Sequence, residues 1–117
     1  MSRFDVDAYE KQQRRAERAG CVRGRHYTTY VEEVKQLKRE GRLQEAENLL
    51  LKLIKAVEAQ AVIDGLGVAP WYYEHLGIVY RKMGEQAKSD AILQRLDEQR
   101  KLDIERKKNA EAQYMRD

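Results

Sequence analysis

The sequence contains very little cysteine, proline or uninterrupted apolar sequence. Its 117 residues include one cysteine, Cys21, so no disulfide can form within the chain. A lone cysteine is typical of proteins from reducing compartments. No apolar run approaches the ~18 residues that a membrane-spanning helix requires, and the opening residues lack the apolar stretch of a secretion signal. We therefore expect a cytoplasmic protein without a membrane partner.

Histidine is also scarce, which limits the chemistry that the chain can carry out. His26 and His75 are the only two histidines, and neither has cysteine or carboxylate neighbours at metal-ligand spacing. Cys21 has no predicted general base near it. Gly65 and Gly67 lack the preceding strand and the following lysine and hydroxyl of a phosphate-binding loop. We expect no metal, no cofactor and no enzymatic activity.

Charged and helix-forming side chains make up much of the sequence. Charged residues account for 37% of the chain, and leucine, alanine, glutamate, lysine, arginine and glutamine lose little rotamer freedom in a helix. The 23 basic and 20 acidic side chains nearly balance. Only residues 1–25 are clearly basic, with seven basic and four acidic groups. The length favours one domain, and the composition favours an all-α fold.

Glycines divide the chain into five predicted helical segments. Gly20 and Gly65 stand where left-handed C-caps are expected, and Pro70 suits the first turn of a helix. Asp7 and Thr29 each precede a glutamate at capping-box spacing. The predicted helices cover residues 7–19, 29–40, 43–64, 70–83 and 86 onward, with residues 21–25 as a loop and a polar tail beyond residue 104.

The predicted helices differ in how much apolar surface they carry. The segment 43–64 is apolar around most of its circumference, which predicts a central helix packed on two sides. The first segment has a thin apolar face, formed by Tyr9 and Ala16. We expect the first helix to dock loosely, or to become ordered only on a partner.

A helix, a glycine turn and a second helix occur twice in the sequence. The second copy contains Leu76-Gly77-Ile78-Val79-Tyr80, which matches the Leu-Gly-x-x-Tyr signature of the tetratricopeptide repeat family, and residues 27–97 resemble that family. The first copy has Glu33-Val34 in place of Leu-Gly, and the turn glycines are 43 residues apart instead of the family's 34. Aligning Gly41 with Gly84 superposes Tyr30 on Tyr73, Leu37 on Tyr80, Ala46 on Ser89, Leu50 on Leu93 and Leu53 on Leu96.

The resemblance implies an array of antiparallel helical hairpins with two repeats and flanking N- and C-terminal helices. On this basis residues 1–25 form a basic helix and loop, 26–104 a helical core, and 105–117 a polar helical extension. Such repeats usually need about three units for stability, so the flanking helices act as caps or the protein forms a homodimer. The whole chain is also similar to short tetratricopeptide-like proteins of unassigned function from actinobacteria and their phages.

Members of the family commonly bind ligands on a concave face lined by the first helix of each repeat. Carried over by position, that face contains a cluster of cationic side chains, which favours an acidic peptide or carboxylate. The alternative is that these are ordinary solvated ends of helices, where cations suit the helix dipole. The cluster consists of Lys35, Lys38, Arg39, Arg81 and Lys82.

Two apolar residues on the fourth predicted helix lie beside this cluster. Trp71 and Ile78 are seven positions apart and off the stripe that predicts the core. They are either an exposed anchor for a partner or, as we favour, side chains that pack beneath a neighbouring cap helix.

The sequence therefore predicts a non-enzymatic adaptor that binds another protein, with an acidic partner preferred. One alternative is a small phage-type or regulatory inhibitor that occludes a host enzyme, with the first helix as its docking element. A second, less favoured alternative is a nucleic-acid accessory protein that contacts phosphates through its basic N-terminal segment. That segment carries Lys11, Arg14, Arg15, Arg18, Arg23 and Arg25, and is interrupted by Glu10 and Glu17.

Overall fold

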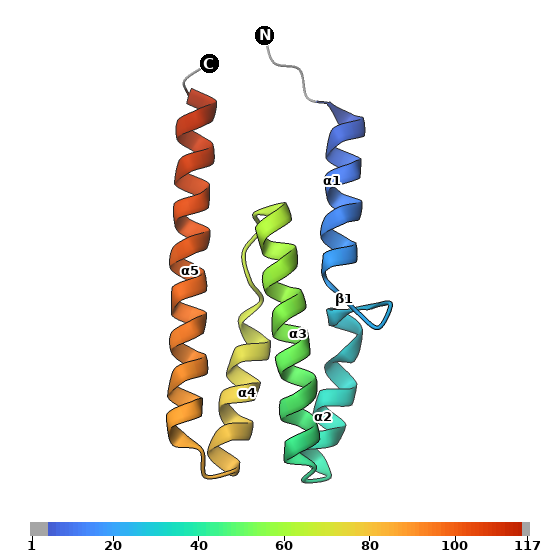
Figure 1. Ribbon diagram of the computed structural model, residues 1–117, viewed down its shortest axis with the longest axis vertical. Helices are drawn as coiled ribbons and strands as arrows, with labels where there is room; N and C mark the ends of the chain where they lie inside the picture. The colour runs from blue at the N-terminus through green and yellow to red at the C-terminus, as the bar shows by residue number, and fades with distance from the viewer. Residues whose placement is uncertain (1–4, 116–117) are drawn as a thin grey trace.

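The fold is all-α, as predicted, apart from one small sheet. The computed structural model describes residues 5–115. The elements are α1 (Val6–Ala19), β1 (Cys21–Val22), β2 (Arg25–His26), the 3₁₀ helix η1 (Tyr27–Tyr30), α2 (Val31–Arg39), α3 (Leu43–Asp64), α4 (Pro70–Lys82) and α5 (Gln86–Met115). The helices form one staggered layer in the order α5, α4 and α3, followed by α1 and α2, which lie one after the other along the same side of α3 (Figure 1).

The layer is long and thin. Its principal dimensions, measured over Cα atoms, are 57 × 28 × 14 Å. The start of α1 and the end of α5 lie at the same end of the molecule, and the two tight helix–helix turns lie at the other (Figure 1). Within residues 5–115, no helix combines the length and the apolar character needed to cross a bilayer.

The two helical hairpins, α2–α3 and α4–α5, close with the same backbone geometry. The turn residues Gly41 and Gly84 have φ angles of 71° and 76°, a left-handed conformation that glycine adopts without steric cost. The predicted turns are therefore confirmed. In each hairpin the residue after the glycine donates its N–H to a carbonyl five residues earlier: Arg42 to Leu37 at 2.9 Å and Glu85 to Tyr80 at 2.8 Å.

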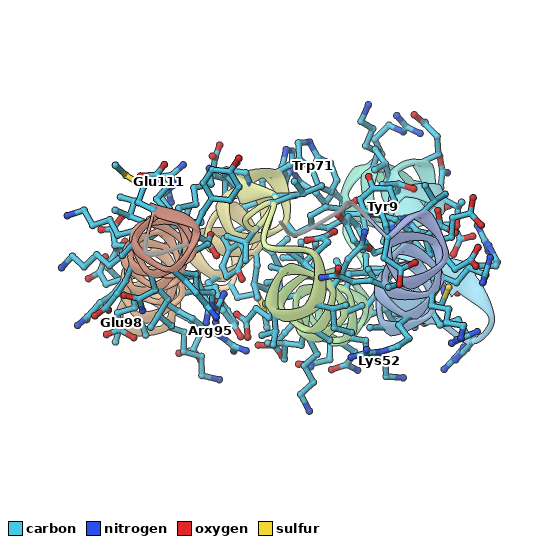
Figure 2. All side chains as sticks on the ribbon, turned by 90° about the horizontal axis from the view of Figure 1, so that it is seen from above. Tyr9, Lys52, Trp71, Arg95, Glu98 and Glu111 are labelled. Atoms are coloured by element: carbon cyan, nitrogen blue, oxygen red, sulfur yellow. The ribbon has the colours of Figure 1, made fainter. Side chains whose placement is uncertain are left out.

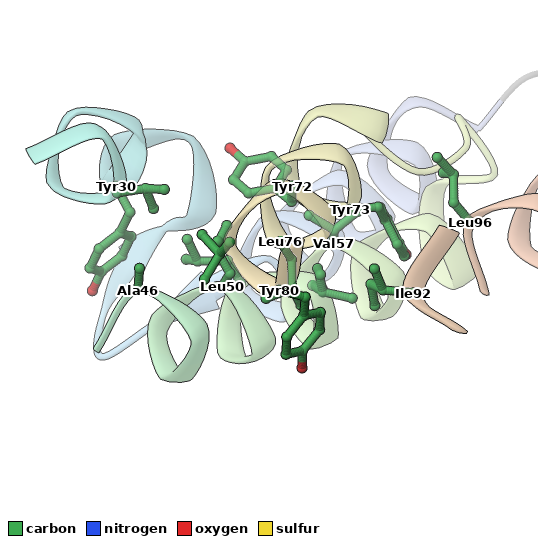
Figure 3. Packing of buried hydrophobic residues seen from close by; sticks show 14 residues of the cluster. Tyr30, Ala46, Leu50, Val57, Tyr72, Tyr73, Leu76, Tyr80, Ile92 and Leu96 are labelled. Atoms are coloured by element: carbon green, nitrogen blue, oxygen red, sulfur yellow. The ribbon is translucent and has the colours of Figure 1, made fainter. Parts of the chain in front are cut away.

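Helix α3 is the central helix, as its apolar circumference predicts. It has the predicted limits and packs against α1, α2 and α4. Removing this much apolar side-chain surface from water is the main favourable contribution to folding. Figure 3 shows how aromatic and aliphatic side chains from the two hairpins interdigitate around it. The largest fully buried side chains include Tyr73, Leu50, Leu53, Ile54 and Leu76.

A buried serine on α5 is hydrogen-bonded to the backbone of α4. The hydroxyl of Ser89 donates to the carbonyl oxygen of Gly77 at 3.0 Å. At the aligned positions of the first hairpin, Val34 and Ala46 are both fully buried. The serine that replaces the expected alanine is thus accommodated by a hydrogen bond that satisfies its buried hydroxyl.

Both predicted capping boxes are wrong. Helix α1 begins at residue 6, and its cap is Asp5 rather than Asp7, because only Asp5 has the extended backbone that an N-cap requires. The Thr29 hydroxyl donates to the carbonyl oxygen of His26 at 2.8 Å instead of capping α2. The His26 side chain accepts from Thr28 N–H at 3.4 Å, which starts a 3₁₀ turn ahead of α2.

Gly20 ends α1 as predicted, but not through a left-handed cap. Its φ angle is −80°, which any residue adopts. The space around it explains the glycine: a Cβ would overlap the Gln60 side chain and lie 2.8 Å from Nε2 of His26. Those two side chains are hydrogen-bonded to each other at 2.6 Å. Helix α1 contacts α3 near this point and buries Ala16 completely.

Residues 21–25, predicted as a loop, belong mostly to a β-hairpin. Cys21 pairs with His26 and Val22 with Arg25, so only two residues form the turn. Their φ angles, 52° at Arg23 and 80° at Gly24, are both positive, which is typical of a type I′ turn. A strand pair this short has too few residues for an alternating pattern to predict it.

The segment between α3 and α4 is hydrogen-bonded to α5. Gly65 adopts the predicted left-handed cap with φ 68°, and Pro70 is the first residue of α4, as predicted. The N–H of Val68 donates to the carboxylate of Asp103 at 3.1 Å, and Arg106 pairs with the same carboxylate at 3.1 Å. Helix α5 runs through residues 104 and 105 without a break.

Candidate binding site on helices α2 and α4

Four of the predicted cationic residues surround one hollow between the two hairpins. The hollow has a volume of about 260 Å³ and lies open to solvent. Three of its side chains come from the last two turns of α2, and the fourth comes from the last residue of α4. Because the two hairpins close at the same end of the molecule, the C-terminal turns of α2 and α4 bring these charges together. The lining residues are Lys35, Lys38, Arg39 and Lys82.

A histidine connects the two helices beside this hollow. The Lys38 ammonium lies 2.7 Å from Nδ1 of His75, which therefore accepts the hydrogen bond as a neutral imidazole. The His75 ring stacks on the Trp71 indole with the ring centroids 4.0 Å apart. Trp71 in turn meets the Tyr72 ring edge-on at 5.0 Å. The α2 end of the site is thus held against α4 by a polar contact supported by aromatic packing.

Partial burial, together with the neighbouring cations, lowers the pKa of both partners in this contact. The pKa of Lys38 is lowered, first by partial burial and then by repulsion from Lys82. The pKa of His75 is also lowered, first by partial burial and then by Lys38; Lys35 adds to the effect and Glu74 opposes it. The positive charges of this site are therefore not fully balanced by nearby carboxylates. An anion bound in the hollow would stabilise the charged forms of both Lys38 and His75.

The other cationic residues of the hollow are only partly neutralised. Lys35 lies 3.6 Å from the exposed carboxylate of Glu32. Arg39 donates to the side-chain oxygen of Gln36 at 2.8 Å, and its charge helps to lower the pKa of Glu40, after that carboxylate's hydrogen bonds to Gln36 and Arg42 and the charge of Arg42. Within the described residues, no carboxylate lines the hollow. The site is consequently suited to bind a group that carries more than one negative charge.

The other three predicted site residues do not line the hollow. The side chain of Arg81 is exposed but does not line the hollow as that of its neighbour Lys82 does, because successive residues of a helix point about 100° apart. Trp71 and Ile78 are half-buried. Trp71 packs against the core, with His75 and Tyr72 of its own helix as its ring partners. Its two predicted roles, an anchor for a partner and packing beneath a cap helix, both stay predictions.

His75 is the residue that the sequence analysis missed. It has no metal-ligand neighbour, which is why its sequence surroundings gave no sign of a site. The available signal was its position between Trp71 and Ile78, since residues 71, 75 and 78 share one helical face. Its partner Lys38 lies 37 positions away in the sequence.

The cations of the basic N-terminal segment lie on α1 and on the β-hairpin, away from the hollow on α2 and α4. Arg25 pairs with Glu33 at 2.7 Å and lies over the Tyr30 ring, 4.2 Å from its centroid. The side chains of Arg14 and Arg18 on α1 are exposed. Residues 1–4, where Arg3 stands, lie outside the described part of the chain.

The remaining reactive side chains are held in structural hydrogen bonds. The Cys21 thiol donates to the carbonyl oxygen of Glu17 at 3.1 Å. Although Cys21 and His26 are cross-strand neighbours, the two ring nitrogens of His26 are hydrogen-bonded to Thr28 and Gln60. Within residues 5–115, no group of three or more histidine, cysteine or acidic side chains is arranged to hold a metal ion.

Comparisons with protein families, with curated proteins and with solved structures found no match to this chain. The resemblance to the tetratricopeptide repeat family, and to short proteins of actinobacteria and their phages, stays a prediction from the sequence.

Proposed function

We propose that this protein is a non-enzymatic binding module that holds an acidic segment of a partner protein in the hollow between α2 and α4. The observation that carries the proposal is the convergence of Lys35, Lys38, Arg39 and Lys82, from two separate hairpins, on one hollow that no carboxylate lines within residues 5–115. An acidic segment supplies the missing negative charge through charge-assisted hydrogen bonds.

The expected affinity is modest and depends on salt. Most of these side chains are exposed, and an exposed ion pair contributes at most about 1 kcal/mol. Four such pairs supply at most about 4 kcal/mol, so we expect a short acidic peptide to bind with a Kd on the order of 1 mM, and salt to weaken binding.

The test is a titration of the isotope-labelled protein with a hexaglutamate peptide, followed by NMR. Lys82 and Arg81 are adjacent and have the same charge, but only Lys82 lines the hollow. Lys82→Glu is expected to weaken binding at least tenfold, whereas the matched control Arg81→Glu changes it less than threefold. Equal losses in both variants would mean that the peptide responds to overall charge only, which contradicts the proposal.

The His75 ring provides a second readout in the same titration. Bound carboxylates favour the imidazolium form, so the peptide is expected to raise the pKa of His75. The ring resonances of His26, which lies in the N-terminal hairpin, serve as an internal reference. An unchanged His75 titration at saturating peptide would place the ligand outside the hollow.

The two alternatives predict different behaviour. An occluding inhibitor would bind one enzyme and abolish its activity. A pull-down with the wild-type protein and with Lys82→Glu would identify the bound enzyme, whose activity would then be measured. A nucleic-acid accessory protein would bind DNA or RNA with a steep salt dependence. That binding would survive Lys82→Glu and be lost on neutralising Arg14 and Arg18, whose exposed side chains lie on α1.

A further inference from the structure

A second hollow lies between α2, α3 and the β-hairpin, on different faces of those helices. Its volume is about 340 Å³, at the lower end of the range of small-molecule sites. Glu33 and Leu37, which line it, lie on the side of α2 away from Lys35, because residues two apart in a helix point in nearly opposite directions. Figure 2 shows Lys52, which also lines it, on the face of the molecule opposite Trp71.

The hollow is lined by both apolar and charged side chains. Val22, Leu37 and Leu49 contribute half-buried aliphatic side chains to it. Tyr30 closes one side, where its hydroxyl donates to the carbonyl oxygen of Val22 at 2.5 Å. Asn48 adds an amide, whose oxygen accepts a hydrogen bond from Gln44 at 3.1 Å.

The charges around this hollow are not balanced. Its two carboxylates already have partners, since Glu33 pairs with Arg25 at 2.7 Å and Glu45 with Arg42 at 2.8 Å. Its two cations, Arg23 and Lys52, have no ion-pair or hydrogen-bond partner among residues 5–115. The site therefore presents two uncompensated positive charges next to apolar surface.

Arg23 occupies a backbone position that suits other residues better. It is the only non-glycine residue with positive φ in the described part of the chain. The first turn position of a type I′ hairpin normally holds asparagine, aspartate or glycine, since other side chains clash there. An arginine at this position costs stability, and it places a guanidinium at the edge of the hollow.

From this arrangement we propose that the second hollow binds a small amphiphilic carboxylate. Its carboxylate is held by Arg23 and Lys52, and its apolar chain of several carbons lies along Val22, Leu37 and Leu49. A charge-assisted contact to arginine fixes the head group, and removal of the chain from water contributes the larger share of the affinity. This site is separate from the hollow on α2 and α4 and does not depend on the function proposed for it.

The first arm of the test compares three probes by NMR titration of the wild-type protein. Octanoate has both the charge and the chain, acetate lacks the chain, and octan-1-ol lacks the charge. Octanoate is expected to bind saturably and at least tenfold more tightly than the other two, with the largest shifts at Val22, Leu37 and Leu49. Equal binding of octanoate and octan-1-ol would overturn the proposal, as would equal binding of octanoate and acetate.

The second arm uses variants whose folding is not at risk. Arg23→Gly and Arg23→Asn both suit the turn, so each should have a melting temperature at or above that of wild type while losing at least tenfold in octanoate affinity. Lys52→Gln should lose at least threefold, whereas the exposed control Lys55→Gln, outside the hollow, should not change. Octanoate affinity that survives both Arg23 substitutions would overturn the proposal.

A final control separates the two sites. Lys82→Glu should change octanoate affinity less than threefold, because Lys82 does not line the second hollow and its charge acts there only across α2. A loss of tenfold or more in that variant would show that the carboxylate occupies the hollow on α2 and α4 instead, and would overturn the assignment.

Discussion

The carboxylate of Glu58 joins three helices. It lies on α3, accepts a hydrogen bond from the Tyr73 hydroxyl of α4 at 2.7 Å, and receives two from the Arg95 guanidinium of α5, each at 2.8 Å. The Glu58 side chain is only 18% exposed. Bidentate contacts of this kind are stronger and more specific than single ones.

Glu58→Gln is expected to lower the free energy of unfolding by about 1–2 kcal/mol, because it removes the charge from a hydrogen-bonded, partly buried network. Urea denaturation followed by circular dichroism measures the change. The exposed Glu98→Gln on α5 is the control and should lie within about 0.5 kcal/mol of wild type. A Glu58→Gln variant as stable as wild type would contradict the role assigned to this carboxylate.

Roles of single residues were the hardest to predict from the sequence. Glu58 resembles any other glutamate on a charged helix, and its partners lie 15 and 37 positions away. The same holds for His75, whose contact with Lys38 exists only once the two hairpins are packed. Gly20 was placed correctly but for the wrong reason, because the side chains that exclude a Cβ there come from distant segments.

At the scale of secondary-structure elements, α5 has two parts that contribute unequally to the stability of the fold. Its first part contributes the buried Ser89, Ile92 and Leu96 and then Asp103, which fastens the segment before α4. From residue 107 to 115 every side chain is exposed. A helix without packing partners is only marginally stable, so the last part contributes little to the fold.

Truncation separates the two parts. A chain ending at residue 106 should match the full-length protein within about 0.5 kcal/mol of unfolding free energy, since no buried side chain is lost. A chain ending at residue 101 loses Asp103 and should be destabilised by about 1 kcal/mol or more. Hydrogen exchange at the N–H of Val68 should also become faster in the shorter chain. Equal stability of the two truncated chains would contradict the role of Asp103.

The elements themselves followed from local signals. The limits of α3 and the turns at Gly41, Gly65 and Gly84 were predicted correctly, because apolar periodicity and left-handed glycine are encoded within a few residues. The β-hairpin and η1 were not predicted, since two-residue strands have no periodicity to detect. Four of seven predicted site residues gather around one hollow, because the repeat register aligned the ends of α2 and α4 correctly.

At the scale of the whole molecule, buried tyrosines make the stability of the fold sensitive to alkaline pH. Burial raises the pKa of Tyr72 and of Tyr80 to about 12, and it raises the pKa of Tyr73 further. A hydrogen bond to Glu47 adds to the effect at Tyr80. In the unfolded chain these phenols titrate near 10, so as pH rises the unfolded state loses its protons first.

The contribution of these tyrosines to stability should therefore be constant below pH about 10 and fall between pH 10 and 12, by up to about 1.4 kcal/mol per pH unit for each buried tyrosine. Circular dichroism and tyrosinate absorbance measured across this range test the expectation. Tyr80→Phe should reduce the loss, whereas Tyr114→Phe, at a position that is 80% exposed, should not. Full ionisation of all tyrosines in a still-helical protein would contradict it.

The thinness of the layer has a thermodynamic consequence. Helix α2 lines both hollows, with Lys38 and Arg39 toward one and Glu33 and Leu37 toward the other. Were both proposed ligands bound, two anions would lie on opposite sides of one helix, whose diameter of about 10–12 Å is close to the screening length in physiological salt. Binding of either proposed ligand would then lower the affinity for the other by the same factor, without any change of conformation.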